Sequence, residues 1–297
     1  MLKNYSSITE FYLLGFPGSK ELHNILFATF FFFYSVTLIG NMVIILTVCV
    51  DKRLQSPMYF FLAHLSVLEI LITSVAVPVM LWGLLLPGMQ AVSLSACCVQ
   101  LYLYLSLGTS ELLLIGAMAV DRYVAVCNPL RYTIIMNSRT CLWVVIVSWV
   151  FGFSFLAHHF YCDRGQLLKL SCDNSLFTEL ILFLMAVFII VGSMIPTVVS
   201  YTCIISTILR IPSGSGRRKA FSTCASHFTF VVIGYGSCLF LFVKPKQTQA
   251  AEYNRVASLM VLVVNPFLNP FIFTLRNDKF IEAFRNVMKR CYQLLRD

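Results

Sequence analysis

Long stretches without a charged residue constrain this chain more than any other feature of its sequence. Each of them can supply the roughly 20 apolar residues of a helix that crosses a bilayer. Glu69 and Glu111 are the only charged residues that interrupt them. The stretches cover residues 22–50, 54–86, 91–120, 140–162, 180–209, 220–243 and 256–275. We therefore predict an all-α membrane protein whose single domain, 1–297, is a bundle of seven transmembrane helices.

The composition excludes a soluble protein that carries only a membrane anchor. Charged residues make up 12% of the chain and hydrophobic residues 59%, whereas a soluble domain carries about a quarter charged residues. The connections on one side, 51–56, 123–139 and 211–219, are too short for a soluble catalytic domain. The sequence also has neither a Gly-x-Ser-x-Gly elbow nor a glycine-rich phosphate loop. We expect no enzyme, and a function that lies inside the bundle or at its ends.

Positive residues orient the predicted bundle. Of the 22 Lys and Arg residues, 15 fall on the side of the C-terminal tail and 7 on the side of the N-terminus. Because the more positive side faces the cytoplasm, we expect residues 1–21 outside the cell, 22–276 in the helical bundle and 277–297 in the cytoplasm. This bias, with anionic inner-leaflet lipid as its partner, accounts for most of the net charge of +9. Nothing calls for nucleic acid, and the expected location is the plasma membrane.

The predicted outer face carries residues that are typically modified there. Asn4 heads an Asn-Tyr-Ser acceptor for N-glycosylation. Cys97, Cys98, Cys162 and Cys172 fall on the same oxidising side, where disulfides are permitted. Four cysteines allow three full pairings, so their spacing alone leaves the connectivity open.

The last segment, 277–297, predicts a short amphipathic helix on the inner membrane surface. Its apolar residues recur at helical spacing, and basic residues lie between them. The apolar members are Phe280, Ile281, Phe284, Val287 and Met288, and the basic members are Arg285, Lys289 and Arg290.

Two acids and one ion pair lie where charge is costly, within or at the end of predicted membrane helices. Glu69 and Glu111 could hold a cation, form a proton relay or share a proton, and these alternatives stay open. Arg122 is always ionised and needs an acceptor, for which Asp121 is the nearest candidate. A paired arginine that can be released is a two-state element. The Asp121-Arg122-Tyr123 triplet therefore indicates a switch.

With these features and further motifs, the chain resembles the vertebrate olfactory receptors, within the rhodopsin-like (class A) G-protein-coupled receptors. The resemblance covers nearly the whole length. The motifs are Gly40-Asn41, Pro57 to Ser66, Met118 to Tyr132, Ser200-Tyr201, Lys219 to His227, and Pro266 to Phe273 with Leu275-Arg276-Asn277. The family implies a receptor that binds small volatile odorants and activates the olfactory, stimulatory G protein, which raises cyclic AMP.

The resemblance also assigns roles to individual residues. Asp121, Arg122 and Tyr123 resemble the family's ionic latch and G-protein contact. Glu69 and Glu111 occupy positions that resemble a sodium site, so a sodium ion is the one bound cofactor to consider. The other implied switch and coupling positions are Tyr201, Arg217, Arg218, Lys219, Tyr235, Asn269 and Pro270.

The family's odorant pocket lies among the outer halves of helices 3, 5, 6 and 7. The matching positions are Tyr104, Leu105, Gly108, Thr109, Met185, Ile189, Tyr235, Cys238, Leu239 and Ser258. They are mostly apolar with a few hydroxyls, as a pocket for a small volatile requires. No acid or base is among them, which argues against an amine or carboxylate ligand.

The largest departure from the family lies between helix 4 and outer loop 2. From Thr140 to Ala157 the chain has 18 residues, which make a helix of about 27 Å. The string from His158 to Asp163 follows at once, although the family carries it late in a longer loop. A segment is therefore expected to be missing, and Cys172 would lack its usual partner. The resemblance then leaves Cys97 with Cys162 as the implied disulfide.

The chain departs from the family at two further single residues, and two alternative functions stay open. Glu69 replaces the family's usual aspartate, and Phe273 replaces a tyrosine whose hydroxyl would join the inner hydrogen-bond network. A rhodopsin-like receptor for a small lipid or metabolite would differ only in its ligand. A cation or proton transporter would use Glu69 and Glu111 and would need no G protein.

Overall fold

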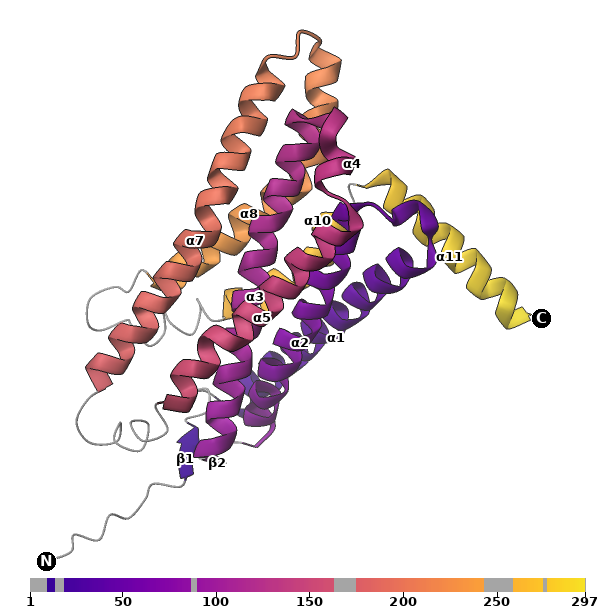
Figure 1. Cartoon of the computed structure of the whole chain (residues 1–297). Coiled ribbons are helices and arrows are strands. Elements are labelled where there is room, and N and C mark those ends of the chain that lie inside the picture. Colours follow the sequence, from indigo (N-terminus) through magenta and orange to yellow (C-terminus); the bar gives the residue numbers. More distant parts are fainter. Residues whose placement is uncertain are drawn as a thin grey trace, which may run out of the picture.

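The computed structural model of the chain is a bundle of long helices (Figure 1). It describes the backbone of residues 10–13, 19–86, 90–162, 175–242, 259–274 and 277–296. The long helices are α1 (Lys20–Val50), α2 (Pro57–Leu85), α3 (Leu94–Cys127), α5 (Ser138–Cys162), α7 (Ser175–Leu209), α8 (Gly214–Phe242), α10 (Asn265–Thr274) and α11 (Asp278–Arg296). The shorter elements between them are η1 (Lys52–Leu54), η2 (Pro129–Arg131), α4 (Tyr132–Ile135) and the π-helical η3 (Met260–Val264).

Each apolar stretch predicted from the sequence carries one of these helices, so the chain is a helical membrane bundle. By length and composition, four helices of the described chain can each cross a bilayer. They are α1, α2, Ser95–Cys127 of α3 and Phe183–Leu209 of α7. The bent pair Pro129–Ile135 and Ser138–Ser154, with an angle of 64°, makes a fifth if it counts as one span. Cys224–Leu239 of α8 and Met260–Thr274 are apolar but shorter.

Helix α3 runs further than the sequence indicates. It continues past Asp121 and Arg122 and ends at Cys127. The inner connection therefore starts at Asn128, where the backbone N–H caps the helix on Val124 O, and not at residue 123 as predicted. As a consequence, the charged pair is held in a rigid helical turn and not in a loop.

Helix α5 is also longer than the 18-residue stretch from Thr140 to Ala157. It comprises 25 residues and ends at Cys162, which corresponds to about 37 Å of helix. The hydrocarbon core of a bilayer is about 30 Å thick, so α5 is long enough to cross it. Its end agrees with the charge-free stretch 140–162, and residues that the family carries in a loop, from His158 to Cys162, continue the helix here.

The end of the bundle where α3 begins contains a two-stranded antiparallel sheet that no pattern in the sequence indicated. Strand β1 (Glu10–Leu13) pairs with β2 (Gln90–Ser93), and Glu10 lies opposite Ser93. The hydroxyl of Ser93 also caps α3, because it accepts a 3.3 Å hydrogen bond from the N–H of Ala96. The sheet thus ties a segment near the N-terminus to the start of α3.

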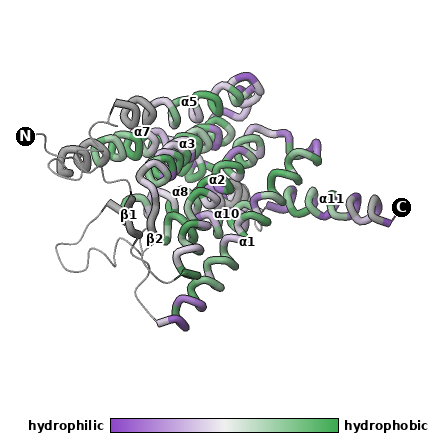
Figure 2. Tube along the Cα trace, turned by 90° about the horizontal axis from the view of Figure 1, so that it is seen from below, coloured by the Kyte–Doolittle hydropathy of each residue, from purple (hydrophilic) through white to green (hydrophobic). Residues whose placement is uncertain are grey.

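The amphipathic C-terminal helix predicted from the sequence is confirmed as α11. Phe280 and Ala283 are buried, whereas Lys279, Arg285 and Lys289 are exposed. Figure 2 shows hydrophobic residues along the bundle helices, and it shows that α11 extends away from the bundle. Its first turns contact α1 and η1.

Two glycines allow helices to approach closely. A Cβ on Gly152 of α5 would lie 2.6 Å from the carbonyl oxygen of Ser106 in α3. A Cβ on Gly40 of α1 would lie 2.8 Å from the Pro270 ring in α10. Both distances are too short for real atoms, so the α5–α3 and α1–α10 contacts require glycine.

The valine substitution Gly152→Val should therefore separate α5 from α3 and destabilise the bundle. Overpacking of this kind costs about 1–3 kcal/mol. The thermal unfolding temperature of the purified protein and its level at the cell surface measure the effect, and both should fall. Gly192→Val in α7 is the matched control, since no described residue lies within 4 Å of the Cβ position of Gly192. Equal unfolding temperatures for the two variants would contradict the packing account.

Candidate functional site

The predicted latch is a buried ion pair inside α3. The Nη2 and Nε atoms of Arg122 donate hydrogen bonds of 2.5 and 3.1 Å to Oδ2 of Asp121. Asp121 is 1% exposed and Arg122 is 7% exposed, so the pair is largely removed from solvent. Tyr123, the third residue of the triplet, is half-buried and packs against the core.

A tyrosine from the next connection completes the latch. The hydroxyl of Tyr132, at the start of α4, donates a 2.8 Å hydrogen bond to Oδ1 of Asp121. Both carboxylate oxygens of Asp121 are therefore occupied, one by Arg122 and one by Tyr132. Tyr132 belongs to the same motif as Asp121, but no spacing rule placed its hydroxyl on that carboxylate.

The inner halves of α7 and α8 meet beside this latch. The hydroxyl of Tyr201 lies 2.5 Å from Nδ1 of His227, and both residues are buried. Arg122 lies within electrostatic range of both. Nε2 of His227 has no hydrogen-bond partner among the described residues. Tyr201 was predicted as a switch residue, whereas His227 was not, because its partner lies on another helix.

The surface at this end of the bundle is basic and also carries exposed apolar side chains. Arg217 and Arg218 are exposed in the first turns of α8, and the side chain of Lys219 lies outside the described part of the structure. Leu130 in η2 is 94% exposed. The sequence did not single out Leu130, because exposure of an apolar residue in a connection is not visible in a periodicity pattern.

The two intramembrane acids meet, with an asparagine from α10 beside them. Glu69 of α2 is 1% exposed, and its Oε1 accepts a hydrogen bond from Nδ2 of Asn269. Glu111 on α3 is half-buried as a residue, and its carboxyl group lies within interaction range of Glu69. Oε2 of Glu69 has no hydrogen-bond partner among the described residues. This buried, unpaired oxygen next to a second carboxyl group fits a small cation with oxygen ligands.

The predicted odorant positions lie on three helices. Tyr104, Leu105, Gly108 and Thr109 are on α3, Met185 and Ile189 on α7, and Tyr235, Cys238 and Leu239 on α8, while Ser258 lies outside the described residues. Two of their hydroxyls are already engaged. Thr109 donates to the carbonyl of Leu105 at 2.8 Å, and the Tyr235 hydroxyl lies 3.5 Å from Oγ1 of Thr197. Pro270, the last switch position, is buried against α1.

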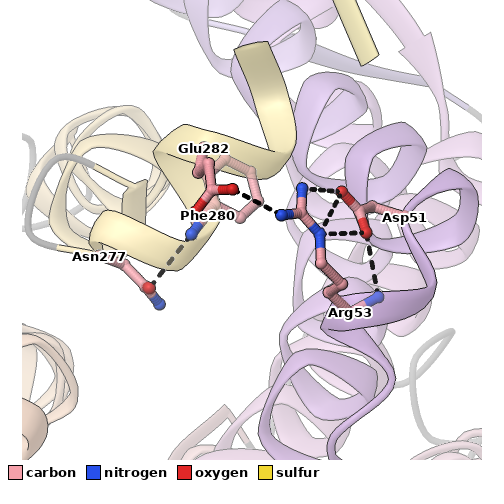
Figure 3. Close-up of polar contacts among 5 residues, drawn as sticks. All are labelled: Asp51, Arg53, Asn277, Phe280 and Glu282. Carbon is pink, nitrogen blue, oxygen red and sulfur yellow. Dashed lines mark hydrogen bonds and ion pairs between the residues drawn. The ribbon is translucent and has the colours of Figure 1, made fainter. Parts of the chain in front are cut away.

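At the inner end, polar contacts attach α11 to the first connection (Figure 3). Arg53 donates to both oxygens of Asp51, and its Nη1 donates a 2.6 Å hydrogen bond to Oε1 of Glu282. The side-chain and backbone hydrogen bonds from Arg53 lower the pKa of Asp51 from 3.8 to about 2. The contribution of this contact to stability is therefore complete above the ordinary pKa of 3.8 and is lost as the pH falls from there through about 2.

A second contact at the same place caps α11. Oδ1 of Asn277 accepts a 3.2 Å hydrogen bond from the N–H of Phe280, and Nδ2 of Asn277 donates to the Tyr59 hydroxyl at 2.9 Å. Tyr59 and Asn277 belong to two of the motifs that carry the family resemblance. The structure therefore brings the start of α2 and the start of α11 together.

A helical membrane bundle with a buried Asp-Arg pair in a long third helix, paired intramembrane acids and an amphipathic helix after the last span is a rhodopsin-like receptor. A family model described as olfactory receptor matches residues 30–291. Human olfactory receptors 9A1 and 9A4 are each 73% identical to this chain over 314 aligned positions, and 9A2 is 70% identical over 318. All three alignments cover 100% of both chains. The chain belongs to the olfactory receptor family, whose members are signalling receptors and not enzymes.

The same alignments bear on the length of the chain. The alignment with receptor 9A1 has 314 positions and this chain has 297 residues, a difference of 17. At least that many positions therefore have no residue in this chain. The difference agrees with the segment that the sequence predicts to be missing near outer loop 2. The predicted disulfide stays a prediction, because Cys97 is exposed in the first turn of α3 and the side chain of Cys162 lies outside the described residues.

Removal of the α11 cap should loosen the helix more than removal of its surface ion pair. Asn277→Ala deletes an N-cap, which costs about 1 kcal/mol, whereas an exposed ion pair contributes about 0–1 kcal/mol. Hydrogen exchange at the backbone amides of residues 278–283 should accelerate more in Asn277→Ala than in Glu282→Gln. The opposite order would show that the ion pair, and not the cap, holds α11.

Proposed function

We propose that this olfactory receptor binds small, mostly apolar volatile odorants among α3, α7 and α8 and activates a heterotrimeric G protein of the stimulatory, olfactory type, which raises cyclic AMP. The observation that carries the proposal is the closed contact of Asp121 with Arg122 and Tyr132 at the inner end of α3. A contact of this kind can be opened by a change elsewhere in the bundle, so it can report on a ligand.

The topology proposed for this function has seven spans, an extracellular N-terminus and α11 on the inner membrane surface with lipid. The four or five spans of sufficient length, the two shorter apolar segments and the excess of Lys and Arg on one side support it. N-glycosylation at Asn4 and a disulfide between Cys97 and Cys162 belong to the same proposal, because both would lie outside the cell.

Signalling in this scheme is a shift between two states of the bundle. An odorant that binds the active state more tightly shifts the population toward it. A shift from 1% to 99% active requires about 5.5 kcal/mol of differential binding, and each hydrogen bond to a charged group contributes about 1.5–3 kcal/mol. The free energy needed to release Arg122 from Asp121 is therefore of the size that the binding of one ligand can supply. We expect α8 to swing outward in that state and to open a cleft that the basic residues Arg217, Arg218 and Lys219 line.

A sodium ion is proposed as a ligand of the inactive state. Glu69 and Glu111 would hold it, and the unpaired Oε2 of Glu69 supports this assignment. The ion would supply a positive charge between two buried acids. Asn269 keeps Glu69 in place through its hydrogen bond, so α2 and α10 would move together.

The latch residues should respond in opposite ways to substitution. Arg122→Ala should abolish odorant-driven cyclic AMP at a normal surface level. Tyr132→Phe removes one hydrogen bond to Asp121 and should raise the cyclic AMP level without odorant by up to about tenfold, because the inactive state loses about 1–2 kcal/mol. A cyclic AMP reporter and surface staining measure both variants. Unchanged signalling in Arg122→Ala would remove the latch from the proposal.

The exposed Leu130 should be a docking residue for the G protein. Full burial of an exposed leucine side chain contributes about 1.5–3 kcal/mol, so its truncation should weaken a contact that buries it. We expect Leu130→Ala to lower the maximal cyclic AMP response severalfold. The odorant concentration that half-saturates the receptor in a binding assay should not change. Val50→Ala, an exposed apolar residue at the inner end of α1, is the control. Equal responses of the two variants would argue that the G protein does not contact Leu130.

The transporter alternative receives no support from the family to which the chain belongs. It would predict ion flux through Glu69 and Glu111 without any G protein, and a loss of that flux in Glu111→Gln. The alternative of a receptor for a small lipid or metabolite shares the latch and differs in the ligand, so an odorant panel in the cyclic AMP assay separates it from the odorant receptor.

A further inference from the structure

One face of α3 leads from the predicted odorant positions to an intramembrane acid. Tyr104, Gly108 and Glu111 are four and three residues apart, so they lie one above another on the same side of the helix. No described residue of another element lies within 4 Å of the position that a Cβ of Gly108 would take. The helix therefore leaves space between the Tyr104 ring and the Glu111 side chain, which is half-buried.

Helix α8 runs antiparallel to α3 across this space. Near the inner end, Arg122 of α3 lies within electrostatic range of Cys224 and His227 of α8. Further out, the Cβ position of Gly234 lies 3.9 Å from Cδ1 of Ile115. The next outward turn brings Glu111 on α3 opposite Cys238 on α8.

The charges agree with this register. Glu111 lies within electrostatic range of both Cys238 and Tyr104, which are two of the predicted odorant positions. The inner end of the pocket region is thus a carboxyl group, whereas the ten positions that the resemblance supplied contain no acid. The absence of an acid among those ten positions therefore does not exclude an amine ligand, because Glu111 is their neighbour.

Several hydroxyls near this depth are already engaged within the described part of the chain. The hydroxyl of Thr109 is engaged within α3, and that of Tyr235 lies next to Thr197 on α7. Ser237, beside Cys238, accepts a 2.8 Å hydrogen bond from Asn265. A carboxyl oxygen accepts up to two hydrogen bonds, so Glu111 can bond a ligand while it contacts Glu69.

We propose that Glu111 forms the inner end of the odorant pocket and selects ligands with a hydrogen-bond-donating head, a hydroxyl or an ammonium group, on a small apolar body. The body would lie in the space beside Gly108, between Tyr104 and Cys238. This inference rests on the odorant-receptor function proposed above. Glu111 also faces Glu69 of α2, which accepts a hydrogen bond from Asn269 of α10. A ligand at Glu111 would therefore act directly on the contact between α2 and α10.

The test compares four ligands that each contain six carbon atoms, hexanol, hexylamine, hexanal and methyl pentyl ether, in cells that express the full chain and the stimulatory G protein. Hexanol and hexylamine should be at least about tenfold more potent than the aldehyde and the ether, as expected for a hydrogen bond to a carboxylate. Glu111→Gln keeps an acceptor but loses the charge, so it should reduce the potency of hexylamine more than that of hexanol.

A second variant covers the case in which Glu111→Gln does not reach the cell surface. Gly108→Val fills the space beside Glu111 without a change of charge and should remove the advantage of hexanol and hexylamine over the aldehyde and the ether. Gly83→Val is the matched control, because Gly83 of α2 also has no described residue near its Cβ position. Equal potency of all four ligands, or an advantage that survives in Gly108→Val as in Gly83→Val, would overturn the inference.

Thermal unfolding of the purified full chain separates this inference from the proposed function. If no ligand changes cyclic AMP at a normal surface level, the proposed coupling fails. Hexanol and hexylamine should still raise the unfolding temperature more than the ether does, and this difference should vanish in Gly108→Val. The absence of such a difference in the wild-type chain would overturn the assignment of Glu111 whatever the cyclic AMP result.

Discussion

The inner end of this receptor depends on one buried ion pair, Asp121 with Arg122. A charge removed from water is costly unless a partner and hydrogen bonds compensate it, and loss of one partner of a buried pair costs about 3–5 kcal/mol. Tyr132 supplies the remaining hydrogen bond to Asp121, so the closed arrangement is complete. It can open only if Arg122 finds another acceptor, and the Tyr201–His227 contact within its electrostatic range offers one. The proposed switch consists of this exchange of acceptors at Arg122.

A second set of polar groups connects the ligand region with the last span. Glu111 faces the predicted odorant positions, Glu69 lies beside it, and Asn269 of α10 donates to Glu69. In the same span, Pro270 packs against Gly40 so closely that no side chain fits between them. A ligand that changes the position of Glu111 therefore acts on α2 and α10 through charge and on α1 through packing.

Much of the fold could be predicted from the sequence, because a membrane helix needs a long apolar stretch and little else. The seven stretches and the amphipathic α11 follow from this rule. The stretch 140–162 also predicts the extent of α5, whereas the resemblance alone would place its last residues in a loop. The strand pair β1–β2 was missed because two four-residue strands leave no periodic signal, and their pairing joins segments that are far apart in the sequence.

The sequence predicts only those site residues that carry a charge within a membrane helix or that belong to a motif of the family. Asp121, Arg122, Glu69 and Glu111 stand out because charge is rare in membrane helices. The partners Tyr132 and His227 do not stand out, since a hydrogen bond between elements depends on the packing of the whole bundle. The position of Glu111 opposite Cys238 also depends on this packing, so the sequence alone does not predict it.

The distance between α4 and α8 tests the central claim most directly. Spin labels on Thr133 of α4 and Ser215 of α8, both exposed, would report it when they are carried by unnatural amino acids, since the chain has 11 cysteines. If release of the Asp121–Arg122 pair is coupled to an outward movement of α8, an activating odorant together with the G protein should lengthen this distance by several ångströms. An unchanged distance at odorant concentrations that raise cyclic AMP would contradict the account.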